Sequence, residues 1–127
     1  MIYTTLNILR AHHPCADGYA KLVKHVGLKL DKDKPIPLAT ILKSNGLKDT
    51  LWCLRATMPN EAAQRNKLAR LFACDCAEHV IKFYKNKYPN DNRPQNAIDV
   101  ARRFAYGEAT GQERDAAGDA AGAAAAA

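Results

Sequence analysis

The sequence has no apolar run close to the roughly 20 residues that a membrane-spanning helix needs. Its first residues, Met1 to Cys15, also lack the basic and then apolar order of a secretion signal. These two absences predict a cytoplasmic protein with no membrane partner. The four cysteines are therefore expected to be reduced thiols that act as small buried side chains, rather than the framework of a disulfide-bonded fold.

The sequence also lacks the motifs that carry common chemistries: it has no GxxxxGK[ST] or GxGxxG phosphate loop, no GxSxG elbow and no HExxH pair. On a helix, Cys74 and Cys76 point about 200° apart and cannot share a metal, and Cys76 with His79 supplies only two ligands. We therefore expect no catalytic residue, no metal and no cofactor. An enzyme with an unrecognised site, built on His12, His13 or His79, is kept as an alternative hypothesis to the binding functions considered below.

Positive charge dominates the chain, and its sign changes near the end. The 127 residues carry 19 Lys and Arg against 13 Asp and Glu, a net charge of +6. Residues 1–60 hold nine positive and four negative groups, residues 61–106 nine and five, and residues 107–127 one and four. A basic body favours an acidic partner, either nucleic acid or an acidic protein surface, although scattered lysines are also typical of an ordinary solvated surface.

Every periodic segment of the sequence is helical. Glycine or proline ends most of these segments, Asp17 and Asn60 are expected as N-caps, and Thr110 with Glu113 forms a capping box. Short strands are plausible only near the N-terminus and at Ile36–Ile41. The predicted helices cover residues 4–12, 17–26, 38–43, 47–58, 60–88, 94–106 and 111–127.

The fold class that follows is all-α, an irregular bundle of five to seven helices. We expect one helical domain over residues 1–110, with the alanine-rich residues 111–127 as a C-terminal helix that docks on a partner or dimerises. Gly118 and Gly122 lie four residues apart on that helix and would form a smooth face for self-association, which makes a homo-oligomer possible.

The longest predicted helix carries a broad apolar stripe that we expect to pack into the core. It also carries lysines in its last turns, where positive charge suits the helix dipole. The residues of the stripe are Leu68, Phe72, Ala73, Cys76, Ala77, Val80, Ile81, Tyr84 and Tyr88.

Two groups of residues are candidate partner-binding sites. Trp52 and Arg55, three apart on a helix, are of the types enriched at interface hot spots; the alternative is that Trp52 fills the core and Arg55 pairs with a nearby carboxylate. The second group is basic, is interleaved with tyrosines and could also contact phosphate, but its spacing matches no helix-turn-helix or other known nucleic-acid reader. Its members are Lys82, Lys85, Lys87, Arg93, Arg102 and Arg103.

Several stretches resemble known proteins. The segment Ile41 to Ala56, ILKSNGLKDTLWCLRA, resembles one found in small phage and prophage proteins of unassigned function. The CAEHV stretch from Cys76, the segment Pro89 to Thr110 and the alanine-rich tail are similar to immunity proteins of bacterial toxin systems. The tail departs from those relatives, because its alanine repeats are short and lack tryptophan.

The resemblance implies a helical, non-catalytic protein of a phage or other mobile element that acts in the bacterial cytoplasm. It supplies no active site to carry over. We therefore expect a binding protein that occludes a protein of the bacterial host or of a competitor. The occluded protein would be a component of a defence system or a toxin. The alternative is a nucleic-acid-binding accessory protein that uses the basic group.

Overall fold

A computed structural model describes residues 1–126 and divides the chain into two compact units, Met1–Arg65 and Asn66–Ala127. Within the described residues there are seven α-helices, two short 3-10 helices and a single two-stranded sheet. This confirms the all-α prediction. The two strands lie in the two regions that the sequence marked as plausible, and no helix of the described part is long and apolar enough to cross a membrane.

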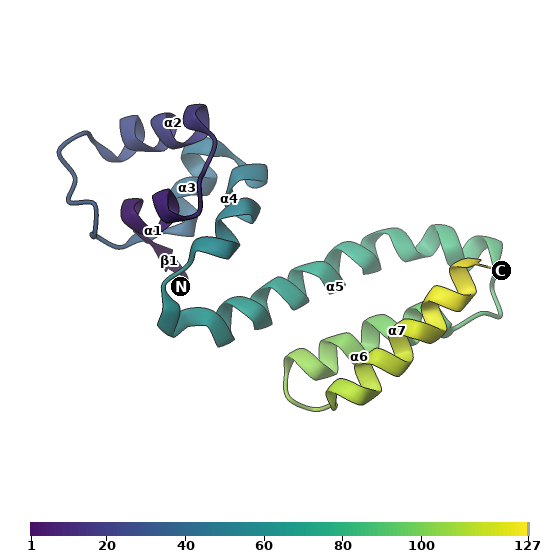
Figure 1. Ribbon diagram of the computed structural model, residues 1–127. Coiled ribbons are helices and arrows are strands. Elements are labelled where there is room, and N and C mark those ends of the chain that lie inside the picture. Colours follow the sequence, from purple (N-terminus) through teal and green to yellow (C-terminus); the bar gives the residue numbers. More distant parts are fainter. Residues whose placement is uncertain (127) are drawn as a thin grey trace. The chain divides into compact units, whose positions relative to one another are not determined.

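The first unit is a small sheet followed and covered by short helices (Figure 1). The two strands pair antiparallel, with Tyr3 opposite Pro37 and Thr4 opposite Ile36. Its elements are β1 (Tyr3–Thr4), α1 (Leu6–Ala11), α2 (Ala16–Val26), β2 (Ile36–Pro37), α3 (Leu38–Asn45), α4 (Leu47–Cys53), η1 (Leu54–Ala56) and η2 (Pro59–Glu61).

The core of this unit gathers one or two apolar side chains from each of α1, α2, β2, α3, α4 and η1. Ile41 is its largest fully buried apolar side chain, at 1% exposure. Thr4 is also fully buried, and its hydroxyl donates to the carbonyl of Ala56, so the strand is tied to the end of the unit without an unsatisfied polar group. The other buried apolar residues of this core are Ile2, Leu6, Leu9, Leu22, Ile36, Leu38, Cys53 and Ala56.

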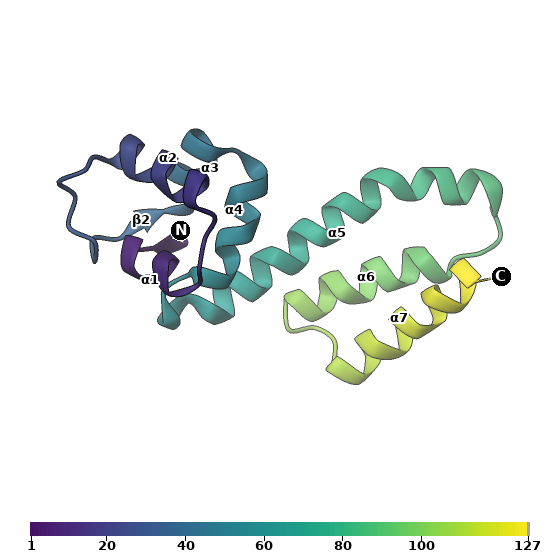
Figure 2. The ribbon, with the colours of Figure 1, turned by 45° about the horizontal axis from the view of Figure 1, so that its top comes forward.

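The second unit is built from three helices, α5 (Ala62–Lys87), α6 (Arg93–Ala105) and α7 (Gly111–Ala126). Helix α5 begins in the first unit and continues through the second. In this unit α6 lies between α5 and α7, and successive helices run in opposite directions (Figure 2). The side chains buried here are small or medium in size: Cys74, Ile98, Val100, Ala117 and Ala124.

Most predicted helix ends are confirmed, and two predicted N-caps are wrong. Helix α2 begins after Cys15, which places Asp17 in the first turn, where its charge still suits the dipole. Asn60 does not cap α5, because Pro59–Glu61 form a 3-10 turn before it. Glu61 turns back to the first strand, where its carboxylate accepts from the backbone N–H of Tyr3 at 2.8 Å.

The capping box at the start of α7 is confirmed. The backbone N–H of Glu113 donates to the Thr110 hydroxyl at 3.1 Å, and the N–H of Thr110 donates to the Glu113 carboxylate at 2.6 Å. Gly46 has a φ of +87° between α3 and α4, a conformation that L side chains rarely adopt, so the Asn-Gly stop of the sequence is also confirmed.

Candidate functional site

Trp52 and Arg55 lie at a cavity of about 560 Å³ within the first unit. Its walls come from α2, α3 and α4, and its base is formed by the core residues Leu9, Leu22 and Ile41. The remaining lining residues are Pro14, Cys15, Gly18, Tyr19, Asn45, Lys48, Asp49, Leu51 and Cys53. A mostly apolar cavity of this size with a few polar groups is typical of a site that accepts a side chain or small molecule.

Arg55 is held over the indole ring of Trp52. Its guanidinium carbon lies 4.9 Å from the ring centroid, and its Nε donates to the backbone carbonyl of Trp52 at 3.1 Å. Trp52 is half-buried and Arg55 is exposed. Trp52 therefore packs partly against the core, while Arg55 and the ring face beneath it form a preorganised surface. Each of the two interpretations of the sequence, core residue and interface residue, thus describes part of the pair.

The polar edge of the cavity is a small network between α2, α3 and α4. The Asn45 side-chain amide donates at 2.9 Å to both the Gly18 carbonyl and the Asp49 carboxylate. Burial raises the pKa of the neighbouring Cys53 thiol to about 11, with a further contribution from the charge of Asp49. That thiol stays protonated at neutral pH, so it is a poor nucleophile and metal ligand.

Helix α5 has two apolar faces within the second unit, and the prediction that its broad stripe packs into the core is wrong for one of them. Cys74 is buried and Leu71, Ala77, Ile81 and Tyr84 are partly buried on the covered side. The opposite side is exposed, and we call it the α5 stripe. Its residues are Leu68 (45% exposed), Phe72 (43%), Cys76, Val80 (54%) and Phe83 (66%).

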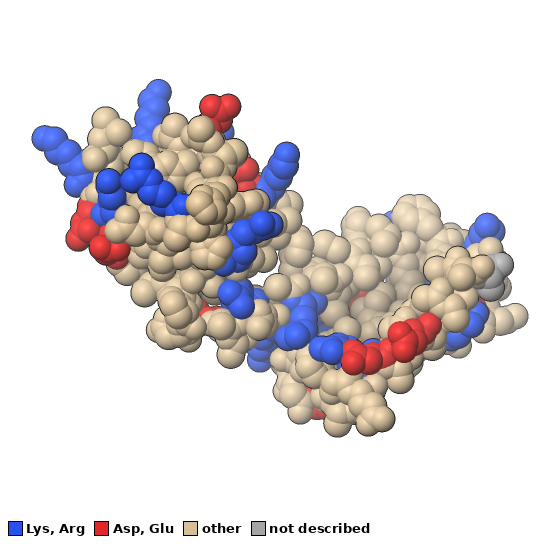
Figure 3. Space-filling model, in the orientation of Figure 1, with Lys and Arg blue, Asp and Glu red and all other residues tan. Residues whose placement is uncertain are grey.

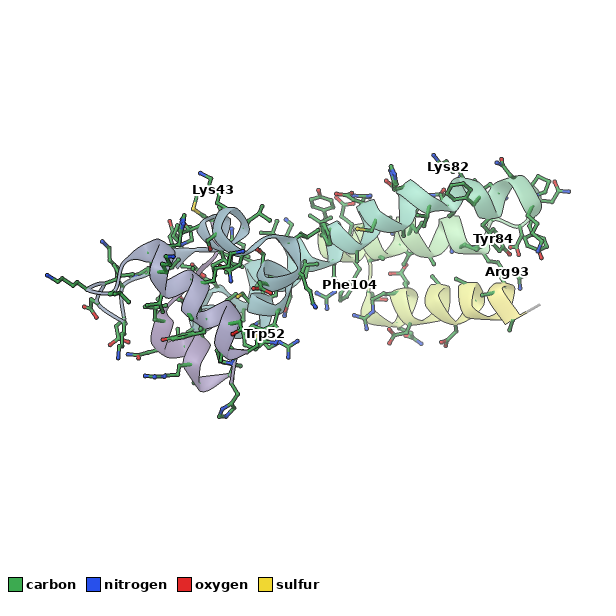
Figure 4. All side chains as sticks on the ribbon, turned by 90° about the horizontal axis from the view of Figure 1, so that it is seen from above. Lys43, Trp52, Lys82, Tyr84, Arg93 and Phe104 are labelled. Carbon is green, nitrogen blue, oxygen red and sulfur yellow. The ribbon has the colours of Figure 1, made fainter. Side chains whose placement is uncertain are left out.

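The three lysines near the end of α5 do not face the same way. The Lys82 ammonium lies 5.4 Å from the ring centroid of Phe83, beside the α5 stripe, and Figure 4 shows Lys82 on the side of α5 away from α6. Lys87 lies 5.2 Å from the ring centroid of Tyr88. From its position in the helical period, Lys85 projects from the side opposite the α5 stripe. Lys87 lies four residues after Phe83, on the same side of the helix, so Lys82 and Lys87 are the lysines that border the stripe.

Arg93 is fixed at the link between α5 and α6. Its guanidinium makes two hydrogen bonds to Asp91, at 2.8 and 2.9 Å, and the Tyr84 hydroxyl donates to the same carboxylate at 2.7 Å (Figure 4). The Arg93 hydrogen bonds hold the pKa of Asp91 well below its usual range, and the bond to Asp91 raises the pKa of Tyr84. This network shapes an open hollow of about 940 Å³, lined by residues 87–93 with Asn96 and Ala120.

Arg102 and Arg103 lie near the C-terminal end of α6, whereas Arg93 begins that helix, so the helix separates them by about 14 Å. Arg102 bridges to Asp75 at 3.0 Å and to Glu78 at 2.9 Å, and these ion pairs join α6 to α5. Arg103 donates to the carbonyl of Glu108 at 3.0 Å. The structure therefore does not bring the six basic residues into one patch, and the three arginines form hydrogen bonds or ion pairs within the chain.

Gly118 and Gly122 lie on the exposed side of α7, with nothing within 4 Å of the position that a Cβ would occupy. The same helix exposes Glu113, Asp115 and Asp119, and Figure 3 shows acidic side chains in a row along it. Self-association through the glycines remains a prediction. Part of the predicted tail, residue 127, lies outside the described residues.

Within residues 1–126 no group of three or more His, Cys, Asp or Glu side chains is placed to hold a metal ion. Burial raises the pKa of the Cys74 thiol, as it does that of Cys53, whereas Cys15 and Cys76 are exposed. The prediction that the cysteines are small buried side chains is therefore confirmed for two of the four and wrong for the other two.

Comparison with known proteins gives one family. The family model described as "Imm-5 like putative immunity protein" matches residues 59–127, more than half of the chain and all of the second unit. No curated protein and no solved structure matches the chain significantly.

Proposed function

The chain belongs to the Imm-5-like immunity protein family, and on that premise we propose that it binds a bacterial toxin and blocks it by occlusion. Immunity proteins are typically non-catalytic, so the activity resides in a preformed surface rather than in reacting groups. The observation that carries the proposal is the family match over the second unit, in which α5 leaves a row of large apolar side chains exposed. A phage-borne inhibitor of a defence system, the other expectation from the sequence, would use the same mechanism on another protein.

The contacts of the basic residues support a protein partner over nucleic acid. Phosphate binding depends on several cations that face one backbone, and each contact made adds to the salt dependence. Here Arg93 and Arg102 are already paired with carboxylates, and Lys85 and Lys87, two residues apart, project from different sides of α5. The cations that remain suit the rim of a protein interface, where charge sets orientation and partner choice.

The proposal can be tested by protection. Bacteria that produce one member of a panel of toxin domains are grown with and without the full chain, and the chain is then purified with its partner after nuclease treatment. We expect survival with one toxin and a stoichiometric, nuclease-resistant complex with it. Recovery of nucleic acid instead, with binding that weakens steeply as salt rises and with no protection, would favour the accessory protein.

A further inference from the structure

The α5 stripe is a continuous apolar row that no described residue of the second unit covers. Its members are spaced by four, four, four and three residues, so they follow one side of the helix for four turns, about 22 Å. Phe83 is 66% exposed and Val80 54%. A straight row of this length, with side chains at helical spacing, fits a second helix packed along it.

The charges beside the stripe define the partner's chemistry. Lys82 and Lys87 border its C-terminal half, and neither forms an ion pair within residues 1–126. The two acidic groups of the same helix, Asp75 and Glu78, share the single positive charge of Arg102, which leaves one negative charge against the two of Lys82 and Lys87. The free charge beside the stripe is therefore positive, and it favours a partner whose flanks are acidic.

A second copy of the chain fits this surface poorly. If two α5 helices paired antiparallel about Cys76, Lys87 would lie level with Arg65 on the stripe side of the helix, which places like charges together. Helix α7 of a second copy is acidic, but the exposed face that carries Asp115 and Asp119 otherwise offers glycine and alanine. Such a face has little apolar area to bury against two phenylalanine rings.

We infer that the α5 stripe is the docking surface for an acidic amphipathic helix of the protein that this chain neutralises. This inference rests on the proposed function, which it makes more specific. The apolar face of the partner helix lies along Leu68, Phe72, Cys76, Val80 and Phe83, and its carboxylates meet Lys82 and Lys87.

The test uses the purified full chain and two labelled helical peptides of about 18 residues, long enough to span the stripe. Both carry the same leucine face, and their remaining positions are Glu in one and Lys in the other. Fluorescence anisotropy is measured at about 50 and about 300 mM salt, which brackets the range over which exposed charges become screened. The acidic peptide should bind, more weakly at the higher salt concentration, and the basic peptide should not.

Two pairs of variants locate the binding site. Phe83→Ala should weaken binding of the acidic peptide about tenfold, whereas Tyr106→Ala, which removes an exposed aromatic ring outside the stripe, should leave it unchanged. Lys82→Glu should weaken it about fivefold at low salt, and Lys85→Glu, with the same change in net charge, should have a much smaller effect. Circular dichroism should show that all four variants remain folded, since each replaced side chain is exposed.

Three results would overturn the inference: equal binding of the two peptides, no binding of either, or an equal loss in Lys82→Glu and Lys85→Glu. A dimer in sedimentation that Phe83→Ala abolishes would also overturn it, because a second copy would then cover the stripe. The proposed function is tested separately, by whether the chain protects bacteria from a toxin. Protection that survives Phe83→Ala refutes this surface only, whereas peptide binding without protection by the native chain refutes the function.

Discussion

Replacing Ile41 by alanine tests whether the core of the first unit lies where the structure places it. Ile41 is 1% exposed and sits between the strands and helices of that unit. The substitution removes three carbon atoms, worth roughly 2.4 kcal/mol at about 0.8 kcal/mol for each buried group, and the cavity left behind adds to this. We therefore expect a loss of about 3 kcal/mol in the free energy of unfolding.

The single tryptophan makes this loss measurable in the first unit alone. Trp52 lines the same cavity as Ile41, so its fluorescence during urea titration follows the unfolding of its surroundings. With a slope of about 1.5 kcal/mol per molar urea, the midpoint should fall by about 2 M. Leu42→Ala is the matched control: it changes the next residue of α3, whose side chain is 47% exposed, and should shift the free energy by about 0.5 kcal/mol or less.

The comparison of these two variants can refute the reasoning. Equal losses in Ile41→Ala and Leu42→Ala would mean that α3 presents another face to the core, and the burial pattern of the whole unit would then be wrong. A loss in Ile41→Ala that left the tryptophan transition unchanged would place Trp52 outside the cooperative unit, against its contacts with the same core cluster.

Three further predictions concern local features. Two thiols should react rapidly with a thiol reagent in the native protein and all four after unfolding, because burial keeps Cys53 and Cys74 protonated; fast reaction of four native thiols would contradict this. Thr110→Ala should lower the stability of the second unit by about 1 kcal/mol in thermal melts, through loss of the α7 cap, whereas Thr110→Ser should restore it. The backbone N–H of Thr110 lowers the pKa of Glu113, so this carboxylate stabilises the folded state above its ordinary pKa of 4.5 and ceases to do so as the pH falls below that value. Glu113→Gln should therefore lose less stability than the native chain between about pH 6 and about pH 3, and an equal loss would contradict the assignment.

Local signals in the sequence were sufficient to predict where most helices begin and end. The Asn-Gly stop at Gly46 and the capping box at Thr110 depend on neighbouring residues alone, and both are present in the structure. The N-cap of α5 failed for a reason that lies far along the chain. Glu61 bonds the first strand, 58 residues away, and the turn that allows this contact displaces the start of the helix.

The candidate site was less predictable, because its features depend on which surfaces the other helices cover. Helix α5 carries two apolar rows, one through Cys74 and Ile81 and one through Phe72 and Phe83, and periodicity merges them into one broad stripe. Only the position of α6 decides between them. In the same way, the residue types identify Arg102 as a cation but not as the partner of two carboxylates on another helix.

The energetics of the α5 stripe indicate why both its rings and its lysines are needed. The exposed parts of Leu68, Phe72, Val80 and Phe83 add up to roughly 400 Å² of apolar surface, which is worth about 10 kcal/mol if it is fully buried at about 25 cal/mol per Å². The loss of translational and rotational freedom on association costs about 4–15 kcal/mol. The apolar surface of the stripe alone is therefore close to balanced by that cost, and the further gain from the partner's own apolar face is the same whether its flanks are acidic or basic. Charge complementarity beside the rings is then what separates a partner with acidic flanks from the many amphipathic helices in a cell, since contact with Lys82 is favourable for carboxylates and unfavourable for another basic surface.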